Sequence, residues 1–404
     1  MKIDLKKLGP GLLFAGAAIG VSHLVQSTRA GADFGFGLLW ALALAHLLKY
    51  PFFQFGPRYA LATGETLLDG YRKLGKGVLI AYFIITFATM FTIQTAVTIV
   101  TAGLATSIFG GFISIEIWTV IILAICLIIL LKGRYQFLDK LMKIIIITLT
   151  ISTIIAVVVA FQNQTKSIVF TQVLPEVAQV GFLIAFMGWM PAPLDISIWH
   201  SIWAIEKQKG NNDFTTKSSL FDFNIGYLFT VIIGLGFISL GALVMFQTGA
   251  DFSSKASEFS DQLLNMYTKN LGDWAYIIIG IAAFTTMFST TLTTLDASPR
   301  AMHKTTDLLF SNLIKTSYVF WIMVLIMGTI LIYFFFASEM GLLIEIATIL
   351  SFLTAPFYAI INYKLICSKH TPLEWRPSQL MHIWSWLGIL FLIGFSLWYL
   401  MTII

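Results

Sequence analysis

The sequence contains few charged residues. Only 11% of its 404 residues are Asp, Glu, Lys or Arg, whereas soluble domains contain about a quarter. Cysteine is also scarce, because Cys126 and Cys367 are the only two. Two cysteines in apolar surroundings make no disulfide framework and no metal-ligand spacing. These shortages exclude an ordinary water-soluble domain and a disulfide-stabilised secreted one.

Catalytic motifs are missing as well. The sequence has no His-Glu-x-x-His, no phosphate-binding loop and no nucleophile–base pair at motif spacing. We therefore expect no enzyme activity and no cofactor. The isoelectric point near 9 is typical of some nucleic-acid-binding proteins, but the placement of Lys and Arg has a better explanation, given below. We expect no nucleic-acid partner.

Hydrophobic residues make up 58% of the chain, and they occur in long runs. A membrane-spanning helix needs about 20 mostly apolar residues. The basic start followed by an apolar run is compatible with a signal peptide, but the apolar character continues past Gly16, and we interpret this run as the first span. The sequence predicts an all-α polytopic membrane protein with about eleven spans. They are 10–32, 36–62, 77–106, 115–132, 135–161, 174–206, 223–247, 274–302, 316–336, 340–367 and 381–403.

The basic residues are distributed unevenly between the two sides of the membrane. With the N-terminus in the cytoplasm, 19 of the 25 Lys and Arg residues fall on the inner side and three fall in outer connections. Such a positive-inside bias is typical of multi-pass proteins. We expect a plasma or inner membrane protein with a cytoplasmic N-terminus and an external C-terminus.

Two of the spans are interrupted. Residues 16–23 (Gly-Ala-Ala-Ile-Gly-Val-Ser-His) weaken the first span, and Pro191 and Pro193 remove two backbone donors from the sixth. Within lipid, freed backbone groups are tolerated only where they are buried in protein or line a cavity. Two packing kinks are the simpler interpretation, but breaks five spans apart favour two inverted five-helix repeats with a shared binding site. We assign residues 1–161 and 174–367 to the repeats and 381–404 to an additional helix.

Several short motifs, in order, resemble the Nramp (natural resistance-associated macrophage protein) divalent-metal transporters. They extend over roughly residues 9–366. They are residues 9–13 (Gly-Pro-Gly-Leu-Leu), 30–36 (Ala-Gly-Ala-Asp-Phe-Gly-Phe), 38–40 (Leu-Leu-Trp), 62–64 (Ala-Thr-Gly), 190–191 (Met-Pro), 289–293 (Ser-Thr-Thr-Leu-Thr) and 355–357 (Ala-Pro-Phe). The resemblance implies the leucine-transporter-type fold, with helices 1–5 and 6–10 as inverted repeats. It also implies transport of manganese, iron or similar ions together with protons.

The metal-binding motif of that family is only partly present. Its helix 1 Asp-Pro-Gly-Asn falls on residues 20–23, which include Gly20, Ser22 and His23, so the carboxylate is absent. Met190 keeps the family's methionine. The resemblance further places a carbonyl ligand at Met187 and a helix 10 ligand at Thr348.

The chain has polar groups of its own near the breaks. His23, Met190 and Asp195 form a candidate metal site, because imidazole and thioether ligands suit Mn, Fe, Co or Cu. Magnesium prefers oxygen ligands and is less favoured. The simpler interpretations are a histidine bonded to a carbonyl, a packing methionine and a helix-capping aspartate.

Four further ionisable residues are predicted to lie in the membrane, where charge is costly and often functional. His46 and Lys49 share a helix face. Asp296 lies four residues before Arg300, so it is either an ion-pair partner or a relay for protons or sodium. Glu345 lies in the tenth span. Lys49 either pairs with an intramembrane acid or acts as an internal cation that replaces a coupling ion.

Three functions remain open at this stage. The leading one is a secondary transporter of divalent metal ions, coupled to protons or another ion. The first alternative keeps the fold but carries an amino acid or another small organic solute, since the helix 1 carboxylate is absent and helix N-termini favour a substrate carboxylate. The second alternative is a membrane sensor that transports nothing.

Overall fold

The computed structural model describes residues 8–110, 112–132, 135–164, 168–211, 213–246, 252–253, 255–272, 275–310, 316–336 and 339–403. The regular structure of these residues is entirely helical. Long apolar runs cannot satisfy their backbone groups from lipid, so each run bonds within itself as a helix. The prediction of an all-α chain is confirmed.

Each of the eleven predicted spans corresponds to a helix or a broken pair of helices. They are α1 (Pro10–Ala18) with η2 (Ser22–Ser27) and α2 (Thr28–Phe34), α3 (Leu39–Thr63), α5 (Lys76–Phe109), α6 (Ile115–Lys132), α7 (Tyr135–Gln162), α8 (Val180–Trp189) with α9 (Ile196–Gly210), α10 (Thr216–Val244), α12 (Ala275–Phe310), α13 (Tyr318–Phe336), α14 (Met340–Cys367) and α15 (Gln379–Ile403).

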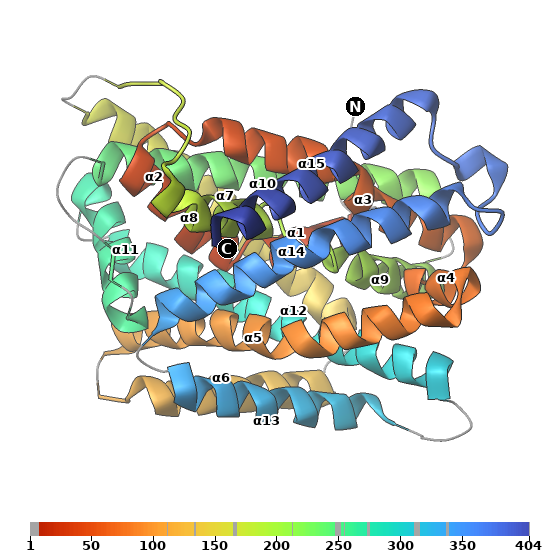
Figure 1. Ribbon diagram of the computed structural model, residues 1–404. Coiled ribbons are helices and arrows are strands. Elements are labelled where there is room, and N and C mark those ends of the chain that lie inside the picture. The colour runs from red at the N-terminus through yellow and green to blue at the C-terminus, as the bar shows by residue number, and fades with distance from the viewer. Residues whose placement is uncertain are drawn as a thin grey trace.

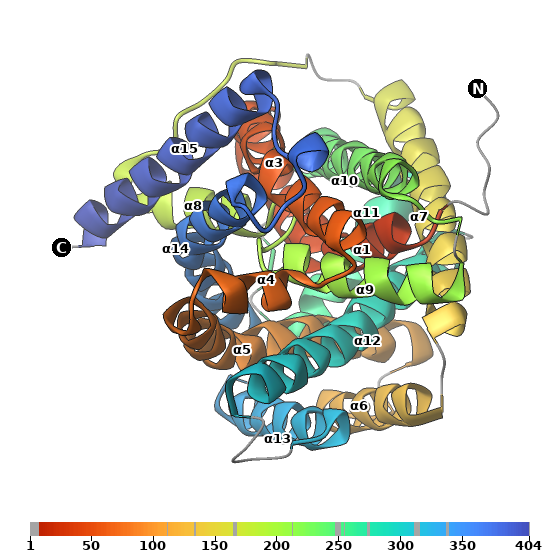
Figure 2. The ribbon, with the colours of Figure 1, turned by 90° about the vertical axis from the view of Figure 1, so that its right-hand side faces the viewer.

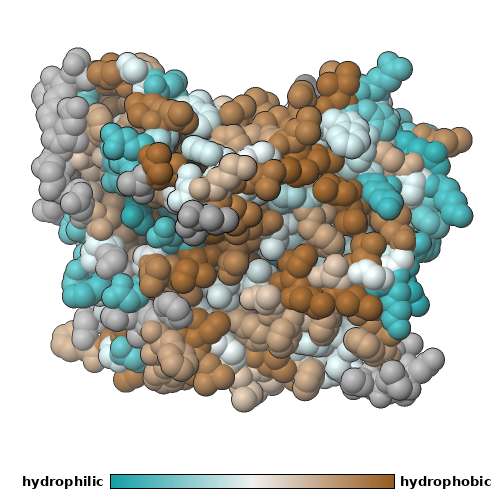
Figure 3. All heavy atoms as spheres, in the orientation of Figure 1, coloured by the Kyte–Doolittle hydropathy of each residue, from teal (hydrophilic) through white to brown (hydrophobic). Residues whose placement is uncertain are grey.

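Within the described residues, seven helices are long and apolar enough to cross a membrane, and the bent pair at the N-terminus makes an eighth. The helices α3 and α12 and the pair α8–α9 carry more polar residues and run beside the others (Figure 1). Brown, apolar residues dominate the middle of the surface in Figure 3, and teal residues gather toward its two ends. This pattern matches a band of lipid around the helices.

The broken helices occupy the centre of the bundle. Figure 2 shows α1 between α10, α9 and α12, whereas α6 and α13 lie at the periphery. The helix α8 packs against α14, and α9 packs against α3. The two breaks are therefore enclosed by protein, as freed backbone groups in a membrane require.

The start of α1 is fixed to α10 by a buried carboxylate. Asp222 accepts hydrogen bonds from the backbone N–H groups of Gly9 (2.9 Å) and Gly11 (2.6 Å), which would otherwise lack helical partners. The two backbones touch here, because a Cβ on Gly11 would lie 2.1 Å from the carbonyl oxygen of Asp222. Gly11 is thus required for the close packing of α1 against α10.

Two shorter helices join the spans. One of them is the amphipathic helix α11 (Ala256–Leu271). The sequence analysis missed α4 (Leu67–Leu74), which begins with a capping box between Thr66 and Asp69. Asp69 also pairs with Lys304 of α12 at 2.8 Å. Although burial opposes it, the bonds from Lys304 and Thr66 hold the pKa of Asp69 below its ordinary value.

Candidate functional site

The first break lies where α1 ends and η2 begins, with a bend of 50° between the two parts. The hydroxyl of Thr290 in α12 lies 3.1 Å from the carbonyl oxygen of Gly16 and 3.2 Å from that of Ile19. These carbonyls belong to the last turn of α1, where intrahelical donors run out. A Cβ on Gly20 would lie 2.8 Å from the Thr290 side chain. Gly20 therefore allows α12 to approach the break and supply a donor.

The second break lies between α8 and α9. Pro191 and Pro193 cannot donate backbone hydrogen bonds, so the carbonyl groups at the end of α8 need partners from elsewhere. The ammonium of Lys49 in α3 supplies them. It donates to three carbonyl oxygens, those of Met187 at 2.7 Å, Gly188 at 2.8 Å and Met190 at 3.0 Å.

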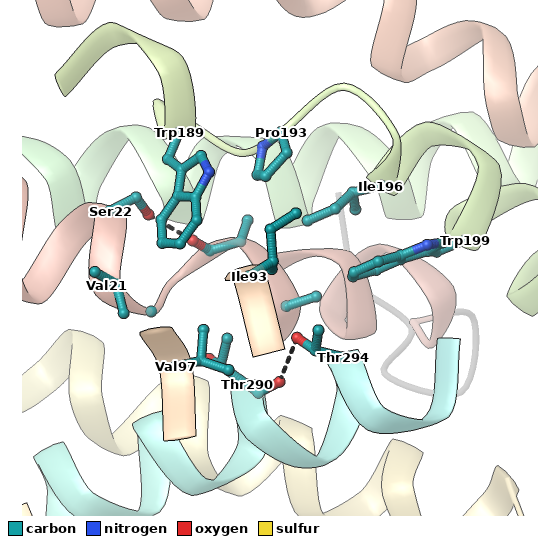
Figure 4. Close-up of a pocket in the computed structure, with 13 residues that line it drawn as sticks. Val21, Ser22, Ile93, Val97, Trp189, Pro193, Ile196, Trp199, Thr290 and Thr294 are labelled. Atoms are coloured by element: carbon teal, nitrogen blue, oxygen red, sulfur yellow. Dashed lines mark hydrogen bonds between the residues drawn. The ribbon is translucent and has the colours of Figure 1, made fainter. Parts of the chain in front are cut away.

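The two breaks face a shared cavity of about 20 Å³, which is room for about one water molecule. In Figure 4, Ser22 and Trp189 lie on its left, Trp199 lies on its right, Pro193 lies above and Thr290 lies below. The remaining lining residues come from the first break, from the helices α1, α9 and α12 beside the breaks, and from α5. They are Ala17, Ala18, Gly20, Val21, Ile93, Val97, Ile196 and Thr294. Both predicted interruptions, and their meeting at one cavity, are confirmed.

A narrower space, too small for a water molecule, adjoins the cavity, and Ile93 and Pro193 line both. Asp195 lies in its wall together with Ser351 and Tyr358. The Asp195 carboxyl is 5% exposed, and its Oδ1 has no hydrogen-bond partner in the described part of the chain. Although Asp195 stands at the start of α9, its side chain makes no capping hydrogen bond. The capping interpretation is therefore wrong.

His23 points toward α10 rather than into the cavity. Its Nε2 lies 3.1 Å from the carbonyl oxygen of Thr230, and its Nδ1 lies 2.7 Å from the hydroxyl of Ser22. A ring that donates Nε2–H to the carbonyl presents the Nδ1 lone pair to the Ser22 hydroxyl, whose one proton is shared with the carbonyl oxygen of Ala18 at 2.8 Å. Met190 contributes its carbonyl oxygen to Lys49, and its side chain is fully buried.

The structure places His23, Met190 and Asp195 around the breaks, with the His23 ring bonded to the carbonyl of Thr230 in α10. Within the described residues, no three His, Cys, Asp or Glu side chains form a group suited to a metal ion. Thr348 is buried beside the second break, since a Cβ on Gly188 would lie 2.3 Å from its carbonyl oxygen. Its hydroxyl bonds back to Ile344 and Glu345 of its own helix.

Of the four candidate coupling residues, His46 and Lys49 are neighbours on α3, whereas Asp296 lies on α12 and Glu345 on α14. The Nδ1 of His46 bonds to the carbonyl of Leu42 at 2.9 Å. Asp296 forms an ion pair with Arg300 at 2.7 Å and accepts from the hydroxyl of Tyr318 at 2.5 Å. The ion-pair interpretation of Asp296 is confirmed.

Glu345 is exposed on α14 and lies near Gly181. Among the described residues, no carboxylate lies within ion-pair distance of Lys49, whose side chain is 0% exposed. The expectation that Lys49 pairs with an acid is wrong, because carbonyl oxygens of the broken helix take that place.

Sequence reasoning missed three polar groups of the core. Asp222 anchors α1, and Thr290 serves the first break. The Thr-rich run in α12 was a signal for the second of these, although most of its hydroxyls bond back to their own helix. The ring of His200 stacks on Phe14 at 5.6 Å, and both of its nitrogens lack partners in the described structure.

Comparison with sequence families supports the early resemblance. Residues 11–402 match the model of a family described as natural resistance-associated macrophage protein-like. An uncharacterized protein of Pasteurella multocida (strain Pm70) is 35% identical over 400 residues, which cover 96% of this chain and 90% of that protein.

Solved structures with a similar fold are much more distant in sequence. The manganese transporter of Eremococcus coleocola, in complex with an aromatic bis-isothiourea compound, matches with a TM-score of 0.76 and 14% identity, over 97% of this chain and 85% of its own. Mhp1, a nucleobase-cation-symport-1 family transporter with bromovinylhydantoin bound, matches with a TM-score of 0.64 and 17% identity, over 98% of this chain and 93% of its own. MhsT in complex with L-phenylalanine matches with a TM-score of 0.65 and 13% identity, over 98% of both chains. These matches confirm the leucine-transporter-type fold.

Proposed function

This chain belongs to the Nramp-like family, whose members are transporters rather than enzymes, and on that premise we propose that it carries a divalent metal ion by alternating access, coupled to protons or another ion. The observation that carries the proposal is the cavity between the two broken helices. In transporters of this architecture, substrate sites lie where half-helices meet near the membrane midplane. Rocking of α1 and α8–α9 against the surrounding helices would open the cavity to either side. We place the protein in the plasma or inner membrane with its N-terminus in the cytoplasm.

A divalent ion is supported by family membership and by the chemistry beside the cavity. The structural neighbour from Eremococcus coleocola is a manganese transporter. Asp195 offers a buried carboxyl with one oxygen free of hydrogen bonds, which is the charge that the absent helix 1 aspartate does not supply. Ser22 at the first break and Thr290 of α12 add hydroxyl oxygens to the cavity wall. His23 and Met190 would join them after a side-chain rotation.

Proton coupling is assigned to the same carboxyl. A buried carboxylate is costly in membrane unless it is paired with a cation or a proton. Asp195 would therefore exchange a proton for the metal ion as the cavity fills. The wall around it is closed in this conformation, since Tyr358 and Ser351 line the space in front of it.

Uptake into proteoliposomes tests this proposal. We expect saturable Mn²⁺ or Fe²⁺ uptake that a proton gradient stimulates, and we expect Asp195→Asn to abolish both the uptake and the accompanying proton flux. Asp213→Asn, at an exposed carboxylate between α9 and α10, is the matched control. Uptake that is unchanged in Asp195→Asn would remove this residue from the site. A complete lack of flux for any solute would favour the sensor hypothesis.

A second candidate substrate is a small organic solute. The indole side chains of Trp189 and Trp199 form part of the cavity wall, and the residues lining it include no carboxylate. Such a lining suits an uncharged or zwitterionic molecule better than a bare dication. A binding competition between metal ions and a panel of amino acids separates the candidates. Displacement by an amino acid, with no effect of any metal ion, would select the organic solute.

A further inference from the structure

The carbonyl cluster at the end of α8 is already occupied by a charge. Carbonyl oxygens of three residues, Met187, Gly188 and Met190, converge on the Nζ of Lys49 within 3.0 Å. The helix macrodipole adds negative potential at this C-terminal end. We propose that Lys49 is a tethered cation, whose ammonium fills a carbonyl site that would otherwise attract a free cation.

The hydrogen-bond count supports this assignment. An ammonium has three N–H donors and no acceptor, and Lys49 has three carbonyl acceptors. The face of Phe352 lies 5.8 Å from Nζ and adds a cation–π contact. The charge is therefore balanced by dipoles and an aromatic ring, as it is for an ion held by backbone carbonyls in a channel or a broken helix.

Ionisable side chains inside a membrane protein pair with one another or with backbone carbonyls, or extend their charge toward the interface. Within the described residues Lys49 uses backbone carbonyls, since it is fully buried and its hydrogen-bond partners are main-chain carbonyls. Because these partners come from the broken helix itself, the ammonium holds the break open in place of a dissociable ion.

The position of Lys49 restricts where a transported or coupling cation can bind. A second cation cannot share these three carbonyls with the ammonium, because like charges at contact distance repel. A transported cation would bind closer to Asp195, and no coupling cation would bind at the end of α8. The inference goes beyond the proposed function and holds whichever solute is carried.

The test is removal of the ammonium followed by chemical rescue. The variant Lys49→Ala leaves the carbonyls and a space for a small ion, whereas Lys49→Met fills the same space with an uncharged chain. The purified full-length protein is heated in lipid nanodiscs with increasing sodium or ethylammonium chloride. Tetramethylammonium chloride controls for ionic strength, because a quaternary ion has no N–H donor.

We expect Lys49→Ala to have a lowered Tm that rises again, saturably, with ethylammonium or sodium but not with tetramethylammonium. The wild type and Lys49→Met should show no such rise. An unrecovered Lys49→Ala, or an equal response of all three proteins, contradicts the proposal. If Lys49→Ala does not accumulate in cells, the same ions are supplied during expression. Failure of every ion to restore folded protein would then contradict the proposal in the same way. Solute uptake is not measured, so the result is independent of the transport hypothesis.

Discussion

The buried carboxylate that anchors α1 gives a quantitative prediction. Asp222 accepts two short hydrogen bonds, from the backbone N–H groups of Gly9 and Gly11, and its side chain is 0% exposed. A hydrogen bond to a charged group contributes about 1.5–3 kcal/mol. Replacement by alanine removes both acceptors at once and leaves two buried donors unpaired. We therefore expect Asp222→Ala to lower the free energy of unfolding by at least about 3 kcal/mol.

A graded series distinguishes this anchoring from a general sensitivity of α10. Asp222→Asn keeps one oxygen acceptor but turns an NH₂ group toward the other N–H donor. We therefore expect it to lower the free energy of unfolding, but by less than Asp222→Ala does. Asp213→Ala, at an exposed carboxylate just before α10, is the control. Unfolding in mixed micelles, followed by tryptophan fluorescence, gives the free energies. If Asp222→Ala and Asp213→Ala unfold with the same free energy, the anchoring argument is wrong.

Two further predictions concern the second break and the end of the bundle near α4. Gly188→Ala places a Cβ 2.3 Å from the carbonyl oxygen of Thr348. We therefore expect overpacking to lower the free energy of unfolding by about 1–3 kcal/mol and to reduce uptake. Gly210→Ala, with nothing within 4 Å of the new Cβ, should be close to neutral by the same two assays. The bond from Lys304 helps to hold the pKa of Asp69 below its ordinary value of 3.8, so this contact stabilises the fold above that pH and the stabilisation is lost as the pH falls through the lowered pKa. Lys304→Met should lower the free energy of unfolding at pH 7, and that free energy should then fall less on acidification than it does in the wild type. Acid unfolding curves of both proteins measure this difference. Parallel curves would contradict the prediction.

Much of the architecture could be predicted from composition and length. Apolar runs of about 20 residues form spanning helices in lipid, so the spans that are apolar throughout, and their order, follow from local sequence. Pro191, Pro193 and the glycines of residues 16–23 interrupt those runs by removing donors or helix stability, and both breaks are found there. The repeat boundaries at residues 161, 174 and 367 stay a prediction, as does the orientation in the membrane.

The partners of the buried polar groups depended on the tertiary structure. Lys49 lies 138 residues from Met187 in sequence, and Asp222 lies 213 residues from Gly9. Each of these contacts joins a side chain to a main-chain group, which any residue type provides. The sequence therefore shows which charges must find a partner in the membrane but not where that partner lies. The fold decides it, because the packing of α1, α3, α8 and α10 brings Lys49 to the free carbonyls at the end of α8 and Asp222 to the free N–H groups at the start of α1.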